Sequence, residues 1–290
     1  MQTTDDIFAL RSAIKAARSQ GQRIGCVPTM GALHAGHASL FHVCRAQADF
    51  VVATIFVNPT QFAPQEDFSK YPRPLEKDLE AARQAGVSLV FTPSKESLYP
   101  DDYSTYVTVE GVSAPMEGAI RPTHFRGVAT IVLKLFNIVQ PDVAVFGAKD
   151  YQQQALIRKM VQDLDVPVEI VTAPTMREAD GLALSSRNAY LSPEQRKSAI
   201  ALWESLNFAE DRLHDGEQSI WAVTAAMLER LSQAPGVVPD YAVIADPGTL
   251  RELTAPQPRM VALVAARLGN TRLIDNKEIS LQDVGVQPSG

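Results

Sequence analysis

Cysteine is scarce in this sequence, which has only Cys26 and Cys44 among its 290 residues. Two cysteines, eighteen residues apart, provide no disulfide framework, so we expect reduced thiols and a cytoplasmic protein. The N-terminal segment of residues 1–6 is acidic and lacks the hydrophobic core of a signal peptide. No apolar run reaches the roughly 20 residues that a membrane-spanning helix needs, so we expect no membrane partner.

Basic residues are also fewer than acidic ones. The chain has 27 lysine and arginine residues against 33 aspartate and glutamate residues, which gives a formal net charge of −6. Surfaces that bind nucleic acids broadly are normally basic, so we expect no nucleic-acid partner. A small cationic pocket for a nucleotide is still compatible with this balance. The length is enough for one large domain or two ordinary ones.

Apolar, strand-like segments alternate with amphipathic, helical ones through the first part of the chain. Strands are expected at residues 23–27, 50–57, 88–92, 142–146 and 167–171, and helices from Asp5 or Asp6 to Gly21 and at residues 38–48, 75–85, 127–139 and 151–164, the last of them capped by Asp150. This alternation predicts a Rossmann-like, doubly wound parallel sheet in a domain of residues 1–175. Residues 99–125 are irregular, with a short strand expected at 105–109, and fit a flexible flap or an ordinary loop equally well.

The pattern changes after residue 175. Ser192-Pro193-Glu194-Gln195 is typical of a helix start, with a serine N-cap, a proline in the first turn and a glutamine that completes a capping box. Two long helices are expected, at residues 193–214 and 216–233, followed by strands at 240–244, 260–268 and 271–275. The sequence therefore predicts a smaller α+β domain of residues 176–290.

The most distinctive stretch runs from Cys26 to His37, between the first expected strand and its helix. It contains two histidines, His34 and His37, flanked by Gly31 and Gly36. If a helix opens near Gly36, both imidazoles lie at its N-terminus, where partial positive charge and unpaired N–H groups favour phosphate. A surface histidine pair or half of a zinc site are the alternatives, although the usual zinc spacings are absent.

Three segments follow directly on expected strands: residues 30–37, 58–62 and 147–153. Parallel strands end at a common edge of the sheet, and open α/β sheets bind their ligands there. We therefore expect these three segments to converge on one ligand site.

The stretch Pro28-Thr29-Met30-Gly31-x-Leu33-His34-x-Gly36-His37 resembles the nucleotide-binding signature of the pantothenate synthetase (pantoate–β-alanine ligase) family, within the nucleotidyltransferase superfamily with His-x-Gly-His-type motifs. Further matches are Phe56-Val57-Asn58-Pro59-x-Gln61-Phe62, Tyr71-Pro72-Arg73, Arg121-Pro122-x-His124-Phe125, Gly147-x-Lys149-Asp150-x-Gln152-Gln153, and the run from Arg177 to Asn188. They occur in the family's order and cover nearly the whole chain, which makes the set far more specific than any single motif.

The resemblance implies an ATP-dependent ligase that condenses (R)-pantoate with β-alanine. The products would be pantothenate, AMP and pyrophosphate, formed through a pantoyl-adenylate intermediate. Mg²⁺ with ATP as co-substrate and a cytoplasmic homodimer are implied in the same way. Two alternatives are open: a plain nucleotidyltransferase, which would keep the nucleotide in its product, and a nucleotide-binding homologue that has lost catalysis.

The resemblance also implies roles for individual residues around ATP. Catalytic roles fall to His34, His37, Lys149 and Arg187, which would neutralise or bind phosphate. The implied ATP-binding set is Met30, Gly31, Ala32, Leu33, His34, Ala35, Gly36, His37, Gly147, Ala148, Lys149, Asp150, Met176, Leu184, Ser185, Ser186 and Arg187.

Two glutamines and two aspartates complete the implied site. Gln61 would bind pantoate and β-alanine, and Gln153 pantoate, since an amide can donate to a carboxylate and accept from a hydroxyl. Asp78 and Asp150 would bind Mg²⁺ or its waters, because Mg²⁺ usually takes one or two carboxylates plus substrate phosphates. An exposed charge at a helix end explains each aspartate equally well.

Three residues depart from the family pattern. Ala35 replaces a common acidic residue between the histidines, Thr60 replaces a common methionine, and Ala148 replaces the usual glutamate before the lysine. Both histidines, the lysine and both glutamines are kept, so we expect activity, with the departures bearing on rate and on metal or nucleotide affinity.

Overall fold

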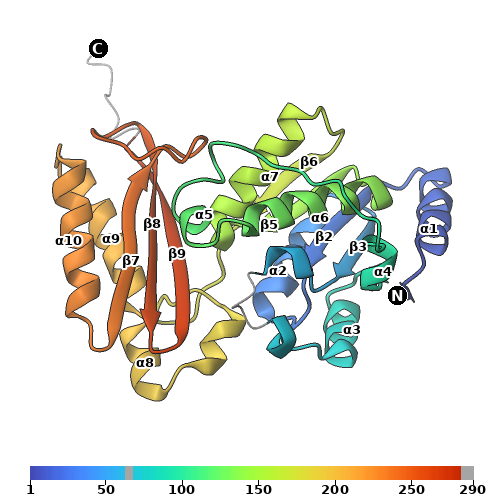
Figure 1. Cartoon of the computed structure of the whole chain (residues 1–290), viewed down its shortest axis with the longest axis horizontal. Coiled ribbons are helices and arrows are strands. Elements are labelled where there is room, and N and C mark those ends of the chain that lie inside the picture. Colours follow the sequence, from blue (N-terminus) through green and yellow to red (C-terminus); the bar gives the residue numbers. More distant parts are fainter. Residues whose placement is uncertain (63–67, 282–290) are drawn as a thin grey trace, which may run out of the picture. The chain divides into compact units, whose positions relative to one another are not determined.

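Six strands form the sheet of the N-terminal unit, Met1–Met176, in the computed structural model, which describes residues 1–62 and 68–281. In chain order they are β1 (Gln2–Thr4), β2 (Ile24–Thr29), β3 (Phe50–Ile55), β4 (Leu89–Phe91), β5 (Val143–Gly147) and β6 (Glu169–Ala173). They lie side by side in the order β1-β4-β3-β2-β5-β6, and every neighbouring pair is parallel. Figure 1 labels β3, β2, β5 and β6 of this sheet. The predicted parallel sheet is confirmed, and the short edge strand β1 is an addition to it.

Helices flank this sheet. They are α1 (Ile7–Ser19), α2 (Ala35–Arg45), α3 (Leu75–Gln84), α4 (Lys95–Leu98), α5 (Glu117–Ile120), α6 (His124–Val139) and α7 (Tyr151–Asp163), with the 3₁₀ turns η1 (Pro59–Gln61), η2 (Phe68–Lys70) and η3 (Ala148–Asp150). Helix α6 packs on both α1 and α7, whereas α2 packs on α3. Strand β3 is accordingly buried on both faces, since Val51, Val52 and Ala53 are at most 1% exposed. A strand with no solvent face has no reason to alternate polar with apolar residues.

The strand order changes direction at β2. Strands β3 and β4 lie on one side of it, and β5 and β6 lie on the other. Ligands of open α/β sheets bind outside the carboxyl ends of the strands at such a switch point. The chain leaves β2, β3 and β5 at this edge through segments that begin at Met30, Phe56 and Ala148. The topology thus brings the three predicted segments to one edge.

Local details of the first unit differ from the prediction. Helix α6 begins at His124, three residues earlier than predicted, so Gly127 lies within its first turn and does not mark its start. No strand forms at residues 105–109, where the amide of Val107 donates to Oγ1 of Thr130 at 2.9 Å instead of to a neighbouring strand. Asp150 precedes α7, but its carboxylate makes no capping hydrogen bond there and lies 3.8 Å from Nζ of Lys149.

The C-terminal unit, Arg177–Gly290, combines a small antiparallel sheet with helices. Its elements are η4 (Ser186–Tyr190), α8 (Pro193–Ser198), α9 (Ala201–His214), α10 (Ile220–Gln233), β7 (Val237–Ala245), β8 (Arg259–Leu268) and β9 (Thr271–Ser280), with the strands in the order β7-β8-β9. The capping box of Ser192 and Gln195 is confirmed. The single helix predicted at 193–214 is wrong, because the amides of Ile200 and Leu202 bond carbonyls three residues back and so split it into α8 and α9. Apolar side chains of α9, α10 and the sheet form the core.

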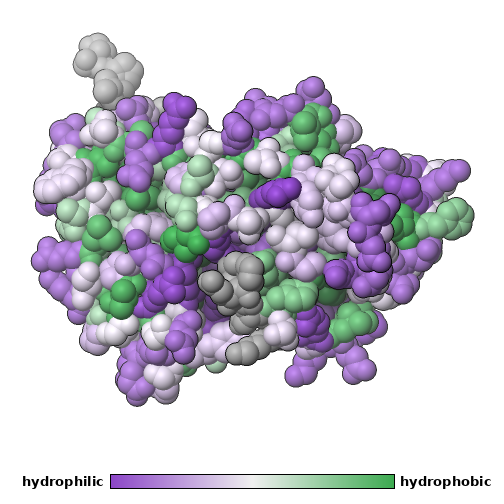
Figure 2. Space-filling view, in the orientation of Figure 1, coloured by the Kyte–Doolittle hydropathy of each residue, from purple (hydrophilic) through white to green (hydrophobic). Residues whose placement is uncertain are grey.

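The surface of each unit is mixed in character. On the face shown in Figure 2, hydrophilic residues predominate and hydrophobic ones are scattered among them. Over residues 1–62 and 68–281, the helices are all too short or too polar to cross a membrane.

Candidate active site

The turn that follows β2 is held by a buried carboxylate. Gly31 and Ala32 both have positive φ, at 80° and 51°, and only the first of them is glycine. Asp78 is 2% exposed, and its Oδ2 and Oδ1 accept hydrogen bonds from the amides of Ala32 and Leu33 at 2.9 and 2.7 Å. A left-handed residue with a side chain costs roughly 1–2 kcal/mol, which these two charge-assisted bonds offset. Asp78 therefore fixes the backbone that leads into the histidines.

The two histidines cap the N-terminus of α2, which opens beside Gly36 as predicted. His34 is the N-cap residue, and its Nδ1 accepts from the amide of Gly36 at 3.1 Å. Nδ1 of His37 accepts from the amide of His34 at 3.3 Å, which completes a capping box. A neutral imidazole has one donor and one acceptor nitrogen. Because each Nδ1 accepts, each ring carries its proton on Nε2 and presents that N–H as a donor.

Both histidine rings are held in the neutral form. Their centroids are 4.2 Å apart. Burial, followed by the proximity of His34, lowers the pKa of His37 to about 4. Burial and then Lys149 also lower the pKa of His34. At neutral pH, the pair therefore offers two uncharged N–H donors beside a lysine cation.

The end of β5 supplies that cation to the same place. Lys149 lies in η3, directly after the strand, with its side chain 18% exposed. Its charge and that of Asp150 both act on the two imidazoles. Gly147 faces α2, since a Cβ placed on it would lie 3.7 Å from Cδ2 of Leu40. The predicted convergence of the histidine turn with the segment after β5 is thus present in the structure.

Gln61 joins this group from the end of β3. It is buried, and its Nε2 donates to Sδ of Met30 at 2.7 Å. Its Oε1 accepts from Nδ2 of Asn58 at 3.2 Å. The same Asn58 amide group donates to the carbonyl of Gly127 at 3.1 Å. These bonds set the orientation of the Gln61 amide beside the histidine turn.

The backbone of Gln61 is held separately by the Arg-Pro-x-His-Phe motif, for which the sequence suggested no role. Nδ1 of His124 donates to the Gln61 carbonyl at 2.9 Å, and Nη2 of Arg121 donates to it at 3.4 Å. The same helix, α6, also packs closely on this backbone three residues later, because a Cβ on Gly127 would lie 2.5 Å from the carbonyl oxygen of Thr60 and 2.6 Å from the amide of Gln61. The glycine is therefore needed for this contact.

Gln153 lies half-buried in the first turn of α7, immediately after the Lys149 segment. The neighbouring Gln152 is buried and uses its whole amide on one loop. It accepts from the amide of Glu117 at 3.0 Å and donates to the carbonyls of Val112 and Pro115 at 2.9 and 2.7 Å. The segment that contains Val112, Pro115 and Glu117 is thus attached to the first turn of α7, one residue before Gln153.

The remaining predicted phosphate contacts lie in or next to the second unit. Ser185 caps η4, and its Oγ accepts from the amide of Arg187 at 3.2 Å. Leu184 and Ser186 are half-buried, whereas the side chain of Arg187 is exposed. Met176, the last residue of the first unit, is 42% exposed.

The two predicted magnesium ligands differ in their surroundings. Both oxygens of Asp78 already serve the backbone amides of the histidine turn, whereas the Asp150 side chain is 52% exposed. The described residues contain no cluster of three or more His, Cys, Asp or Glu side chains that could hold a metal ion by themselves. Such a site fits Mg²⁺ only when substrate oxygens supply most of its ligands, as is usual for this ion.

Comparison with known proteins covers nearly the full length of the chain. A family model described as Pantoate-beta-alanine ligase matches residues 2–278. The chain is 52% identical over 283 residues to the pantothenate synthetase of Moorella thermoacetica, which covers 98% of this chain and 100% of that one. It is 51% identical over 283 residues to the pantothenate synthetase of Pseudomonas paraeruginosa, covering 97% of this chain and 100% of the relative.

Solved structures agree with these relatives. The crystal structure of pantothenate synthetase from Thermus thermophilus matches with a TM-score of 0.91 and 46% identity, covering 97% of this chain and 100% of that one. Pantoate-beta-alanine ligase from Francisella tularensis, crystallised with beta-gamma ATP and beta-alanine, matches with a TM-score of 0.78 and 33% identity, over 96% and 97% of the two chains.

Proposed function

Because this chain belongs to the pantoate-beta-alanine ligase family and joins pantoate to β-alanine at the expense of ATP, we propose that the histidine turn, Gln61 and Lys149 form its active site. In the first step, the pantoate carboxylate attacks the α-phosphorus of ATP, and pyrophosphate leaves. In the second step, the β-alanine amine attacks the carbonyl of pantoyl adenylate, forms the amide bond and displaces AMP. The enzyme's share is positioning the reactants and stabilising charge on phosphate.

The observation that carries this assignment is that Nδ1 of each histidine accepts a hydrogen bond from a backbone amide, which leaves the ring proton on Nε2. Nε2–H of His34 and of His37 are uncharged donors whose orientation is fixed by the backbone bonds to Nδ1. Donors aimed in advance at a group that gains negative charge stabilise the transition state without reorganising. A neutral donor also releases its product more readily than a cation would. Lys149 supplies the positive charge beside this pair.

Gln61 and Gln153 are assigned to pantoate. The amide of Gln61 is oriented by Asn58, so its donor and acceptor directions are set before any ligand binds. A hydroxy acid needs both directions, since its carboxylate only accepts and its hydroxyl can donate. Preorganised groups of this kind improve binding by lowering the ordering cost.

Mg²⁺ is assigned to Asp150 together with the phosphates of ATP. The exposed Asp150 carboxylate beside Lys149 suits an ion that takes one or two protein carboxylates and keeps substrate oxygens and water. When bound, the ion offsets phosphate charge. Asp78 is assigned to the turn instead, because both of its oxygens accept backbone amides.

Ser185, Ser186 and Arg187 are assigned to the β- and γ-phosphates of ATP. The support is the sequence resemblance, together with the chemistry of two hydroxyls and a guanidinium, which bind polyphosphate well. Met176 and Leu184 keep their predicted place beside the nucleotide on the same basis. A cytoplasmic homodimer is also proposed from the family, and sedimentation equilibrium tests it.

The departures from the family pattern fit an active enzyme. Ala35 is exposed at the first position of α2, so it removes none of the bonds that orient the histidines. Oγ1 of Thr60 donates to Asn58 at 3.0 Å and contacts the Tyr99 hydroxyl at 3.4 Å, which braces the residue that orients Gln61. Ala148 precedes Lys149 in η3, and the backbone amides that orient the two histidine rings belong to other residues, His34 and Gly36.

The test of the histidine assignment is His37→Asn, with His42→Asn as its control. Asparagine keeps an acceptor near the position of Nδ1 but has no counterpart of Nε2–H. We expect adenylate formation to fall by about 10²–10³-fold, the usual effect of removing one preorganised donor. His42 lies exposed on the same helix, so its variant should retain normal turnover. Near-normal turnover of His37→Asn would remove this histidine from the mechanism.

A further inference from the structure

Arg177, the first residue of the C-terminal unit, binds its neighbours with nearly its whole guanidinium. Its two Nη atoms pair with Oδ2 and Oδ1 of Asp275 at 2.6 and 2.9 Å. They also donate to the carbonyls of Gly181 and Asn276 at 3.0 and 3.2 Å. The Arg177 side chain is 18% exposed and that of Asp275 is 1% exposed. The pair therefore joins the residues after Arg177 to strand β9.

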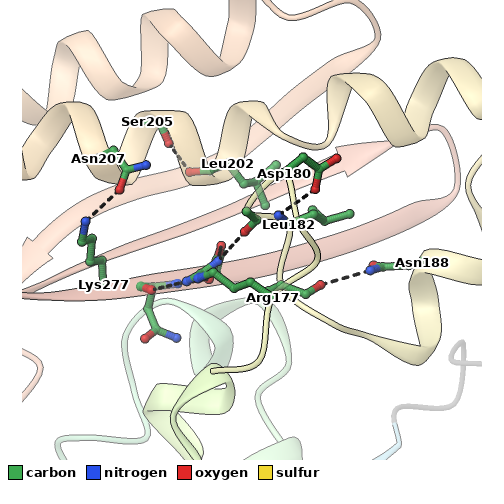
Figure 3. Close-up of polar contacts among 12 residues, drawn as sticks. Arg177, Asp180, Leu182, Asn188, Leu202, Ser205, Asn207 and Lys277 are labelled. Atoms are coloured by element: carbon green, nitrogen blue, oxygen red, sulfur yellow. Dashed lines mark hydrogen bonds and ion pairs between the residues drawn. The ribbon is translucent and has the colours of Figure 1, made fainter. Parts of the chain in front are cut away.

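Trp203 of α9 supports the same guanidinium. Cζ of Arg177 lies 3.7 Å from the centre of the indole ring. Gly181 has a φ of 95°, and a Cβ placed on it would lie 2.0 Å from Cδ1 of Trp203. Lys277 lies 4.8 Å from the ring and is hydrogen-bonded to Asn207 of α9 (Figure 3). The indole thus packs against Arg177 and against Gly181, which lies in the turn four residues later.

Residues 177–183 form a tight hairpin on this support. The Glu178 amide donates to the Leu182 carbonyl at 2.8 Å, and Arg177 pairs with Ala183 in an antiparallel bridge. Arg196 of α8 binds the carboxylates of Glu178 and Asp180 at 2.6 and 2.9 Å, across the turn of the hairpin. The hairpin is consequently fixed from β9, α8 and α9.

The proposed phosphate-binding residues continue directly from this hairpin. Asn188 donates from its Nδ2 to the Ala183 carbonyl at 3.0 Å and to the Glu178 carboxylate at 3.3 Å. The segment from Leu184 to Arg187 is therefore held at both ends, by Ala183 before it and Asn188 after it. Figure 3 shows Arg177, Asp180 and Leu182 on the hairpin and Asn188 on the turn that follows it.

We propose that Arg177, Asp275 and Trp203 are positioning residues for the release of pyrophosphate, because they hold the hairpin that presents Ser185 and Arg187. The proposal rests on the assignment of those residues to the β- and γ-phosphates. A buried ion pair adds little net stability, since the desolvation of its charges opposes their attraction. A bidentate arginine pair does fix geometry in a way that a lysine cannot reproduce. The pair thus acts on the positions of Ser185 and Arg187 more than on folding.

The experiment measures both half-reactions of Arg177→Lys in single turnover. Adenylate formation should fall by roughly 10- to 100-fold, as expected when a binding group is displaced by about 1 Å. The reaction of supplied pantoyl adenylate with β-alanine should change far less, because pyrophosphate is absent from that step. Arg272→Lys is the matched control, since Arg272 of β9 is likewise 18% exposed and pairs with a carboxylate, that of Asp240, at 2.6 Å. It should leave both steps unchanged.

A double-variant cycle separates positioning from simple destabilisation. If Arg177 acts through Arg187, then Arg177→Lys should cost almost nothing further in an Arg187→Ala background. Additive losses, or equal losses in the two half-reactions, would overturn the proposal. If Arg187→Ala by itself leaves adenylate formation unchanged, the assignment of Arg187 to the phosphates of ATP is wrong. That result is distinct from a failure of the positioning proposal, which appears as additive or equal losses. If Arg177→Lys does not fold, Trp203→Phe allows the same comparison of the two half-reactions. We expect it to lower adenylate formation more than the reaction of supplied pantoyl adenylate with β-alanine.

Discussion

Asp78 offers the sharpest perturbation of the site, because a single carboxylate supports the whole histidine turn. In Asp78→Asn, one oxygen becomes an NH₂ group and faces the amide of either Ala32 or Leu33. One charge-assisted acceptor is lost, and a second donor is placed against a backbone donor. The left-handed backbone conformation of Ala32 then loses the charge-assisted hydrogen bonding that offsets its strain.

The magnitude follows from the bonds involved. A hydrogen bond to a charged group contributes about 1.5–3 kcal/mol, and a buried donor without an acceptor costs about 1–3 kcal/mol. We therefore expect the free energy of unfolding to fall by about 3 kcal/mol. We also expect turnover to fall by at least about tenfold, because a displaced turn changes the position and orientation of the His34 ring that follows it.

Urea denaturation and single-turnover adenylate formation measure the two effects. Glu76→Gln is the matched control, since Glu76 lies exposed in the same first turn of α3 and should change both quantities far less. Mg²⁺ titration separates the two roles predicted for Asp78. Normal stability with activity restored by excess Mg²⁺ would refute the turn assignment and return Asp78 to the metal.

Three further predictions follow from the same geometry. Gly127→Ala should raise the KM for pantoate several-fold, because its Cβ would displace the backbone of Thr60 and Gln61; unchanged initial-rate kinetics would contradict this contact. Gln61→Ala and Gln153→Ala should weaken pantoate use and spare ATP affinity, and isothermal titrations showing the reverse would exchange the assignments. The free energy of unfolding should fall by at most about 3 kcal/mol as the pH drops from 6.5 towards 4. Burial and then the proximity of His34 lower the pKa of folded His37 to about 4, whereas the unfolded chain takes up that proton near pH 6.5, so protonation favours unfolding in this window. Urea midpoints that show no difference in this pH window between the wild type and His37→Asn would contradict it.

The sequence predicted most of the sheet, because the evidence for it is local. Strand β3 is a continuous apolar, β-branched run, and a strand buried on both faces has that composition wherever it occurs. The capping box at Ser192 is local in the same way. The division between α8 and α9 was missed, because no glycine or proline marks the two residues between them.

The site was predictable only where its residues follow strands. The histidine turn, Gln61 and Lys149 come together because parallel strands end at one edge, which periodicity alone reveals. The role of Asp78 was not accessible, since its partners lie 45 and 46 positions away and an aspartate in a first helical turn is equally common on a surface. The support of the hairpin by Arg177 and Asp275 spans 98 positions and was hidden for the same reason.

We propose that this site forms pantoyl adenylate before β-alanine takes part. Exchange of labelled pyrophosphate into ATP tests it most directly, because exchange requires reversible formation of the adenylate and nothing more. With pantoate present and β-alanine absent, we predict exchange that needs Mg²⁺ and is lost in His37→Asn. Exchange that requires β-alanine, or that does not require pantoate, would contradict this order of steps.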